Sequence, residues 1–204
     1  HSHQQALLLS DTAAIDDLAH RLQLHHLANP EAHTQFALLT DWGDADEAHT
    51  PRDDALLARA TTCVAELNTR HSQSGDDPAA PRFLLLHRRR RYSISERRWI
   101  GWERKRGKLE QLVAALATSP GEGTPARTAF VQLGALSSPA AGTRYVLTLD
   151  ADTQLPPGRL RELVGVAAHP SNRPRLDPTG RCVRAGYGIL QPRLVTPLPL
   201  PRED

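Results

Sequence analysis

The hydrophobic residues of this chain follow two spacings, which predict helices and buried strands in alternation. Where apolar side chains recur three and four residues apart, as at Ile15, Leu18, Ala19 and Leu22, the spacing predicts an amphipathic helix. Four helices are predicted in this way: one over residues 12–27, one capped by Asp53 or Asp54, one that follows Gly107 and one opened by Pro156 and Pro157.

Short apolar runs lie between these helices and predict strands that are buried on both faces. The runs cover residues 35–40, 82–87, 145–149 and 186–191. Helices that alternate with such strands are typical of an α/β fold, in which helices on both faces cover a mostly parallel sheet. In open sheets of this kind, ligands bind beyond the carboxyl ends of the strands.

The third run ends in two carboxylates one residue apart, Asp150 and Asp152. In an extended chain, residues i and i+2 point to the same side, so we expect both carboxylates to converge on one cation. Hard oxygen ligands suit Mg²⁺ or Mn²⁺, and these ions in turn suit a diphosphate. A nucleotide-sugar transferase needs this arrangement.

The same motif has a simpler explanation, because Asp is also common where a strand ends in a turn. A different enzymatic explanation is excluded by the spacing. Phosphatases and mutases with an aspartyl nucleophile carry Thr two residues after the second Asp, whereas here Thr153 follows Asp152 directly. The motif alone therefore leaves a metal site and a turn open.

The net charge of +2 conceals two segments of opposite charge. Residues 1–81 hold 13 Asp and Glu against four Arg, whereas residues 82–108 hold 11 Arg and Lys against two Glu. A basic patch indicates a polyanionic partner such as a phosphate, a nucleic acid or a membrane surface. A solvated face has the same composition and stays an alternative.

Length and composition restrict the class of protein. The 204 residues suffice for one domain with a hydrophobic core. No apolar stretch approaches the ~20 residues that span a bilayer. Met is absent from the whole chain, which indicates a fragment or a processed protein.

Six segments, taken in order and at their observed distances, resemble the glycosyltransferase domain of cyclic β-1,2-glucan synthases (glycosyltransferase family 84). The resemblance covers nearly the whole chain, and its most specific part is Trp-Glu-Arg-Lys-Arg-Gly-Lys at residues 102–108. The six segments are residues 26–30, 36–42, 86–91, 101–110, 148–153 and 186–193.

The resemblance implies a GT-A-like (Rossmann-like) fold, UDP-glucose as the donor, a divalent metal (Mg²⁺ or Mn²⁺) and a β-1,2-linked glucan as the product of an inverting transfer. It also implies a large, multi-pass bacterial inner-membrane protein whose transferase domain lies on the cytoplasmic face. The expected partners are a UDP-sugar, a glucan acceptor and the membrane-embedded remainder of that longer protein. We expect no nucleic-acid partner.

The resemblance also implies roles for individual residues. Asp150 and Asp152 form the metal and diphosphate site, with Asp152 as the direct ligand and Asp150 on the metal through water or on the ribose. Asp41, which follows the first predicted strand, contacts the uracil or the ribose; a turn or a helix cap is the alternative. Gln191 reaches toward the sugar or the acceptor.

Three cations near the third predicted helix are candidates for contact with the diphosphate. Lys105, Arg106 and Lys108 flank Gly107, where the free N–H groups of a helix start and the added positive charge favour phosphate. A solvated basic run is the alternative. For Arg88–Arg91, a phosphate, an anionic lipid and no ligand at all are left open.

Two parts that such transferases need are missing from the sequence. No catalytic carboxylate motif and no Gln-x-x-Arg-Trp-like acceptor motif follow Gln191, and only residues 6–9 resemble a first strand. We therefore expect residues 1–204 to form the donor-binding part of a single glycosyltransferase domain, truncated at both ends. Its sheet would be incomplete, and it would be inactive alone.

Two rival functions are left open. One is an RNA-binding module that uses Arg88–Arg91 with Tyr92, Trp99 and Trp102, although no RNA-binding signature accompanies these residues. The other is a transferase of the same fold that uses a different sugar donor. We expect the two tryptophans in the core, and the following histidines on the surface: His25, His26 and His33.

Overall fold

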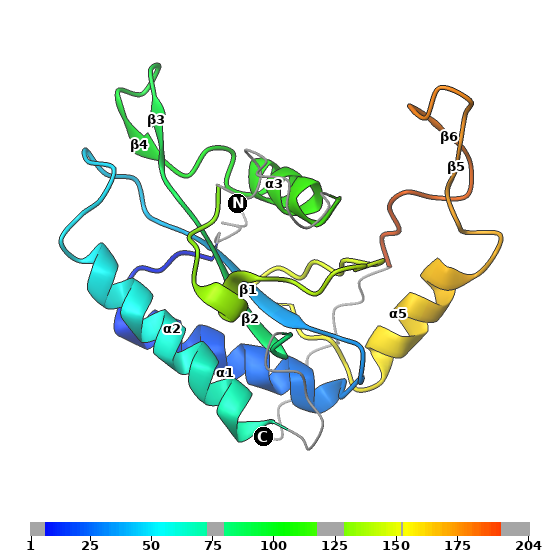
Figure 1. Cartoon of the computed structure of the whole chain (residues 1–204), viewed down its shortest axis with the longest axis horizontal. Coiled ribbons are helices and arrows are strands. Elements are labelled where there is room, and N and C mark those ends of the chain that lie inside the picture. The colour runs from blue at the N-terminus through cyan, green and yellow to red at the C-terminus, as the bar shows by residue number, and fades with distance from the viewer. Residues whose placement is uncertain (1–6, 73–79, 118–128, 152, 193–204) are drawn as a thin grey trace, which may run out of the picture. The chain divides into compact units, whose positions relative to one another are not determined.

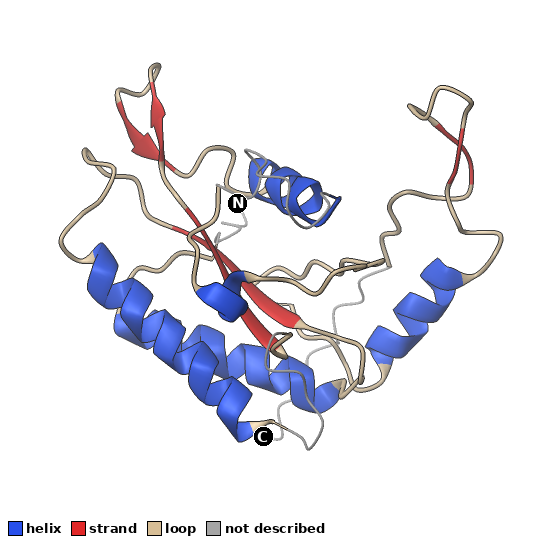
Figure 2. Cartoon of the chain, viewed as in Figure 1, coloured by secondary structure: helices blue, strands red, loops and turns tan. Residues whose placement is uncertain are grey.

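The computed structural model describes residues 7–72, 80–117, 129–151 and 153–192 (Figure 1). The chain divides into two compact units, His1–Pro156 and Pro157–Asp204, and each is described by itself. In the first unit, helices and strands alternate from α1 to β2, and two further short strands precede α3 (Figure 2). They are α1 (Thr12–Ala28), β1 (Phe36–Asp41), α2 (Asp53–Arg70), β2 (Phe83–Arg88), β3 (Arg91–Ser93), β4 (Arg98–Ile100), α3 (Arg106–Ala117) and the 3₁₀ turn η1 (Gly134–Ser137).

Helix α1 begins and ends within one residue of the predicted bounds because its two ends are capped. Asp11 Oδ1 accepts a hydrogen bond from the Ala14 N–H at 2.8 Å, which satisfies a free donor of the first turn. At the other end, the Asn29 N–H donates to the carbonyls of His25 and His26, and Pro30 follows. The predicted helix stop is thereby confirmed.

Helix α2 confirms the second predicted helix, but its start differs in detail. Asp53 lies inside the first turn of the helix, where it accepts hydrogen bonds from the Thr50 N–H at 2.9 Å and the Thr50 hydroxyl at 2.7 Å. The N-cap residue is Arg52 and its side chain forms no cap hydrogen bond, so the predicted cap at Asp53 or Asp54 was wrong. Asp53 instead fastens the residues that precede the helix.

Strands β1 and β2 form a parallel pair in register, with Phe36 opposite Phe83 and Asp41 opposite Arg88. Because residues alternate between faces along a strand, this register sorts the side chains into two layers. Helices α1 and α2 cover one face, and α3 covers the other (Figure 1). The α/β class and the coverage of both faces are confirmed, whereas the GT-A-like arrangement stays a prediction.

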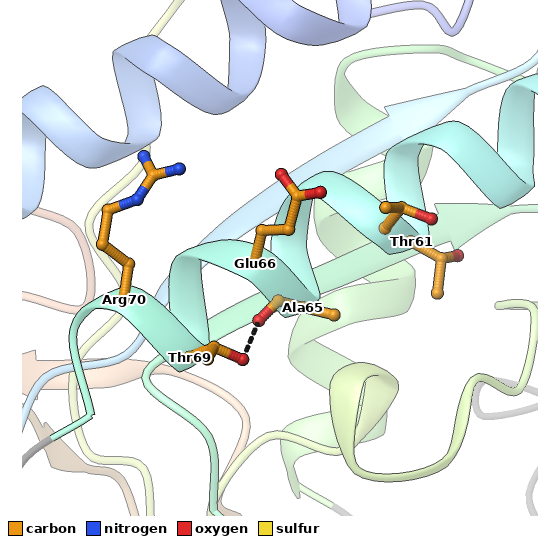
Figure 3. A pocket seen from close by; sticks show the side chains of 6 residues that line it. Thr61, Ala65, Glu66, Thr69 and Arg70 are labelled. Atoms are coloured by element: carbon orange, nitrogen blue, oxygen red, sulfur yellow. Dashed lines mark hydrogen bonds between the residues drawn. The ribbon is translucent and has the colours of Figure 1, made fainter.

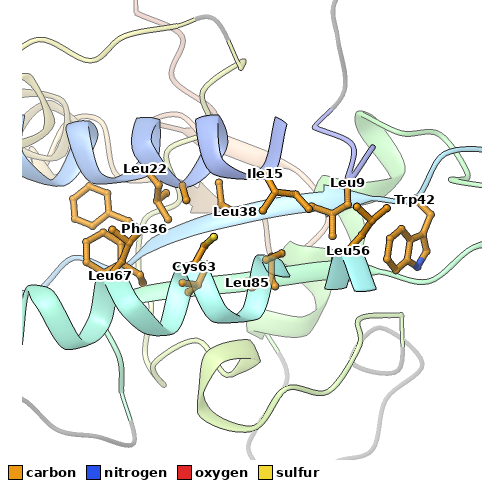
Figure 4. Close-up of a cluster of buried hydrophobic side chains, with 14 residues drawn as sticks. Leu9, Ile15, Leu22, Phe36, Leu38, Trp42, Leu56, Cys63, Leu67 and Leu85 are labelled. Carbon is orange, nitrogen blue, oxygen red and sulfur yellow. The ribbon is translucent and has the colours of Figure 1, made fainter. Parts of the chain in front are cut away.

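The larger hydrophobic core lies between α1, α2 and one face of the sheet (Figure 4). Phe36 and Leu38 of β1 and Phe83 and Leu85 of β2 point into it. The smaller core lies on the opposite face, where α3 packs on the alternate residues of β2. The side chains of this smaller core include Leu84, Leu86, Leu112 and Phe130.

Single bridges extend this sheet on both sides. The Asp41 N–H donates to the Leu7 carbonyl at 3.0 Å, and the Leu9 N–H donates to the Asp41 carbonyl at 3.1 Å, so the proposed remnant of a first strand runs beside the end of β1. On the other side, Phe130 forms an antiparallel bridge with Arg88. The end of β1 is thus flanked on both sides.

The third predicted strand, 145–149, is not formed, and this prediction was wrong. Residues 145–149 pair with no strand among the residues that the structure describes, and the side chains of Tyr145, Val146 and Leu147 are exposed. A strand exists only where its backbone groups pair with a neighbour, and an apolar run carries no information about which neighbour is available. Asp150 consequently follows a segment without regular secondary structure.

Two short hairpins were not predicted. In the first unit, β3 pairs with β4, and in the second unit β5 (Arg175–Leu176) pairs with β6 (Val183–Ala185). The second unit also contains α5 (Arg159–Ala168), which confirms the fourth predicted helix and begins just after Pro156 and Pro157. Residues 186–191 form no strand, so that prediction was wrong. Among the described residues, no helix has the length and apolar character needed to cross a bilayer.

Candidate functional site

Two charged residues end the parallel strands at the edge of the sheet where a ligand is expected. Asp41 and Arg88 are the last residues of β1 and β2 and lie opposite each other in the register. Their side chains are 1% and 2% exposed, and Arg88 Nε donates to Asp41 Oδ1 at 2.6 Å. This edge of the sheet therefore holds a buried, charge-assisted hydrogen bond.

Lys108 in the first turn of α3 completes this ion-pair network. Its Nζ lies 3.1 Å from Asp41 Oδ2, and both side chains are buried. Burial lowers the pKa of Lys108, while the Asp41 carboxylate acts in the opposite direction. Gln111, one turn further along α3, accepts a hydrogen bond from Arg88 Nη1 at 3.2 Å. These contacts fasten the start of α3 to the carboxyl ends of β1 and β2.

One buried nitrogen of this network forms no hydrogen bond within the described residues. Arg88 Nη2 is buried and has no hydrogen-bond partner among the residues that the structure describes. Asp41 is enclosed by the cations of Arg88 and Lys108, so in this state its carboxylate anchors α3 rather than facing solvent. The predicted contact of Asp41 with a nucleoside and that of Lys108 with a phosphate stay predictions.

The predicted phosphate-binding and metal-binding segments do meet, at Lys105 and Asp150. Lys105 Nζ lies 2.9 Å from Asp150 Oδ1 and 3.2 Å from Asp150 Oδ2. The two side chains are 58% and 50% exposed. Arg106 is 74% exposed and contacts Glu103 and Glu110 of its own segment, each at 3.5 Å. Lys105 and Arg106 are therefore accessible, unlike Lys108.

Among the residues that the structure describes, Asp150 is the carboxylate of the predicted metal motif. Asp150 offers the half-exposed oxygen donors that Mg²⁺ prefers, which fits the predicted ligand chemistry. Its partner in the motif, Asp152, lies outside the described residues. Within those residues, no group of three or more His, Cys, Asp or Glu side chains is suited to hold a metal ion. The paired-carboxylate site stays a prediction.

Gln191 lies in the second compact unit and its side chain is exposed. It follows the short hairpin of β5 and β6, and residues 186–191 form no strand. Its proposed role near the sugar or the acceptor stays a prediction.

The basic run of residues 88–91 separates into two buried and two exposed arginines. Arg88 and Arg90 are buried, whereas Arg89 and Arg91 are exposed. This alternation follows from the extended backbone, in which consecutive side chains point to opposite sides. The four arginines are therefore not one exposed patch, and the period of two along an extended chain is the sequence signal for their separation.

Arg90 forms a second buried network that sequence reasoning missed. Its guanidinium pairs with the buried Asp53 carboxylate at the start of α2. It also donates to the Gly43 carbonyl at 2.7 Å and to the Ala48 carbonyl at 3.2 Å, and it lies 5.4 Å from the centre of the Trp42 ring. Burial alone would raise the pKa of Asp53, but hydrogen bonds from Arg90 and Thr50 outweigh it and lower the pKa to about 2. Arg90 thus holds the loop between β1 and α2.

Two tryptophans that were expected in the core are only half-buried. Trp99 packs edge-on against Tyr92 across the β3–β4 hairpin. Trp102 lies against the first turn of α3 at Gly107, and the Arg91 guanidinium carbon lies 5.3 Å from the centre of the Trp102 ring. Trp102 therefore helps to position the helix that follows Lys105.

One of the three histidines expected on the surface is buried. His26 was expected on the surface, but it is buried against Phe36, Phe83 and His71 in the larger core. Position 26 follows Ile15, Ala19 and Leu22 on the buried face of α1, which was the available signal. Its burial lowers the pKa of His26. The prediction was wrong because helix periodicity outweighs the polar character of the imidazole.

A surface hollow of about 530 Å³ lies on α2 (Figure 3). Its lining residues all come from residues 61–70, the end of α2 that leads toward the start of β2. Asp41 and Arg88 are at the opposite ends of their strands. The hollow is therefore not part of the candidate site.

Comparison with known proteins shows which protein this chain is similar to in sequence. No family model matches the sequence. Over 190 residues, or 93% of its length, the chain is 42% identical to the cyclic beta-(1,2)-glucan synthase NdvB of Rhizobium meliloti (strain 1021). The chain spans 6% of the length of that protein. The resemblance to the cyclic β-1,2-glucan synthases that the six segments predicted is therefore confirmed, for one segment of such a protein.

Proposed function

We propose that this chain is the donor-binding part of a glycosyltransferase that transfers glucose from UDP-glucose to a growing β-1,2-glucan. The observation that carries the proposal is the 42% identity to a cyclic β-1,2-glucan synthase over almost the whole chain. The meeting of Lys105 with Asp150 supports it, because the cation and the carboxylate expected at a metal–diphosphate site come from segments 45 residues apart.

Residue roles follow from accessibility. Asp150 and Asp152 together would hold Mg²⁺ or Mn²⁺. Lys105 contacts Asp150, and it would bind the diphosphate together with the exposed Arg106, as Lys and Arg commonly do. Asp41 and Lys108 would position α3 in the unliganded chain, and a donor that enters this edge would reach the unused Arg88 Nη2.

The proposed reaction is a single inverting displacement. The 2-hydroxyl of the glucan end attacks the anomeric carbon, and UDP leaves. When bound, the metal supplies positive charge that stabilises the departing diphosphate. Lys105 and Arg106 add positive charge on the same side, and a carboxylate outside residues 1–204 takes the proton of the attacking hydroxyl.

The proposal extends to the longer protein. Its remainder would contain the acceptor channel and membrane helices, and the segment described here would lie on the cytoplasmic face of a bacterial inner membrane. Gln191 would reach toward the sugar or the acceptor. The chain alone would not extend a β-1,2-glucan primer with UDP-glucose and Mg²⁺, because loss of a general base typically lowers the rate by about 10²–10⁴-fold.

Calorimetry with UDP tests the proposal. UDP should bind in the presence of Mg²⁺ or Mn²⁺ and lose most of its affinity in EDTA, and Asp150→Asn or Asp152→Ala should have the same effect as metal removal. Asp54→Asn, which changes an exposed carboxylate on α2, is the matched control. Equal affinity for UDP with and without metal would rule out the metal-dependent site.

A second titration tests the diphosphate contact. Lys105→Ala should weaken the binding of UDP more than that of uridine, because only UDP carries phosphate. Lys108 is less suitable for this test, since its burial beside Asp41 means that its removal also disturbs the fold. Competition by other UDP-sugars would separate glucose from a different donor. We do not propose an RNA-binding module, because burial of Arg88 and Arg90 removes two cations from the surface that it requires.

A further inference from the structure

The contact between Lys105 and Asp150 places a cation where the proposed metal ligand offers its oxygens. Lys105 Nζ lies within 3.2 Å of both carboxylate oxygens of Asp150, so the ammonium approaches both of them. Both side chains are about half-exposed, which leaves room for the ammonium to move away. A divalent cation on Asp150 and an ammonium at this distance would compete for the same lone pairs.

The Lys105 side of the contact is held by the body of the protein. Lys105 immediately precedes α3, and α3 is fastened to the sheet by the buried pair of Lys108 with Asp41. Trp102 packs against Gly107 in the same turn, so close that a Cβ there would meet the indole ring. The backbone at Lys105 is therefore placed by contacts that do not involve Asp150.

The Asp150 side is held independently. Arg21 of α1 donates from Nη1 to the Ala151 carbonyl at 2.7 Å, and Asn29 donates to the Leu155 carbonyl at 3.4 Å. The Thr153 N–H closes a turn on the Asp150 carbonyl at 3.0 Å. Each of the two backbone segments is therefore held by contacts other than the ion pair. The fold brings Lys105 and Asp150 together, and their ion pair is not needed to hold the segments in place.

We propose that Lys105 is the internal counter-ion of Asp150 and that a divalent cation binds Asp150 only when the ammonium moves off it. This inference rests on the proposed function, in which Asp150 holds the metal. The displaced ammonium stays within reach of the diphosphate that the metal binds. Lys105 therefore opposes the binding of the metal alone and favours the binding of the nucleotide with the metal.

Opposite signs of these two effects make the proposal testable with Mn²⁺ and UDP. Lys105→Ala should bind Mn²⁺ alone about two- to fivefold more tightly than the unaltered chain, the range that corresponds to an exposed ion pair. The same variant should bind UDP more weakly when Mn²⁺ is saturating. Arg106→Ala is the matched control, because it removes a neighbouring charge that contacts Glu103 and Glu110 and not Asp150. Its affinity for Mn²⁺ should change less than that of Lys105→Ala.

A chemical readout follows the ammonium directly. Addition of Mg²⁺ to the unaltered chain should increase the modification of Lys105 by an amine-reactive reagent, measured by mass spectrometry, and Asp150→Asn should show the higher level without Mg²⁺. If Mn²⁺ binds the unaltered chain and Lys105→Ala equally, and Mg²⁺ leaves the modification unchanged, the counter-ion role is overturned while the metal site stands. If Mn²⁺ binds neither protein, the proposed metal role of Asp150 fails and this inference fails with it.

Discussion

The carboxylate of Asp41 and the ammonium of Lys108 form a buried ion pair that joins the end of β1 to the first turn of α3. Arg88 shares the carboxylate from the neighbouring strand. Through this pair, the sheet edge determines where α3 begins and therefore where Lys105 can reach. The position of the accessible cation beside Asp150 thus depends on a buried pair that does not itself face solvent.

Removal of either partner of this ion pair should destabilise the fold. Lys108→Met keeps an apolar stem but leaves the buried Asp41 with one cation, and Asp41→Asn leaves Arg88 and Lys108 without their shared anion. Each change should lower the free energy of unfolding by about 3–5 kcal/mol, as expected when one partner of a buried pair is lost. Urea unfolding of the two variants and of the double variant measures this.

The double variant should cost less than the two single changes together, because the two residues interact directly. Lys105→Ala is the control for a nearby cation, and its exposed pair should contribute less than about 1 kcal/mol. Strict additivity of Lys108→Met and Asp41→Asn would mean that the ion pair contributes no coupling energy.

Adjacent arginines should respond very differently to the same substitution. Arg90→Lys loses the hydrogen bonds to the Gly43 and Ala48 carbonyls and the paired geometry with Asp53, so the free energy of unfolding should fall by about 2–4 kcal/mol. Arg89→Lys changes an exposed side chain and should stay within about 0.5 kcal/mol. Equal effects in chemical denaturation would contradict the burial pattern of residues 88–91.

Gly107→Ala should destabilise α3, against the usual helix preference. Within a helix, Ala is normally favoured over Gly by about 1 kcal/mol. Here a Cβ would lie 2.6 and 2.7 Å from two ring atoms of Trp102 and 3.0 Å from its carbonyl oxygen, so the ring must move and amide exchange in α3 should accelerate. Gly165→Ala in α5 is the control, because nothing lies within 4 Å of its added Cβ. Slower exchange in α3 of Gly107→Ala would show that Trp102 yields without cost.

The elements that the sequence predicted well are those whose pattern is local. Helix α1 follows from its spacing and from Asp11 and Asn29 at its ends, and β1 and β2 follow from their apolar runs, of which only β2 is buried along its whole length. The predicted strand at 145–149 has the same composition, but within the described part of the chain it pairs with no other strand. Pairing depends on distant backbone, which no local pattern encodes.

The candidate site shows the same limit. Sequence reasoning selected Asp41, Lys105 and Asp150, and the structure places Lys105 beside Asp150. The sequence did not reveal that Asp41 is enclosed by Arg88 and Lys108, because burial of a charge depends on which cations the fold brings to it. The role of Arg90 was missed for the same reason, since its partner Asp53 lies 37 residues away.

Acid should destabilise the protein through His87, which lies opposite Thr40 in the sheet. The His87 side chain is fully buried, its Nδ1 lies 2.8 Å from the Thr40 hydroxyl, and burial lowers the pKa of His87 from 6.5 to about 3. Above pH 6.5 the imidazole is neutral in both the folded and the unfolded chain, so it contributes no pH dependence. Between pH 6.5 and about 3 the unfolded chain takes up a proton that the folded chain does not, so stability falls by up to about 1.4 kcal/mol per pH unit.

Urea unfolding at pH 7 and at pH 4.5 tests this prediction. Both pH values lie above the pKa of Asp53, so the protonation of Asp53 contributes little to the difference between them. His87 should account for a loss of about 2–3 kcal/mol between the two pH values. In His87→Gln the stability should fall by that much less, although the variant starts from a lower value at pH 7 because the glutamine is buried in its place. His33→Gln alters an exposed imidazole and should retain the pH dependence of the unaltered chain. If His87→Gln loses as much stability on acidification as the unaltered chain, protonation of His87 is not the cause of the acid destabilisation.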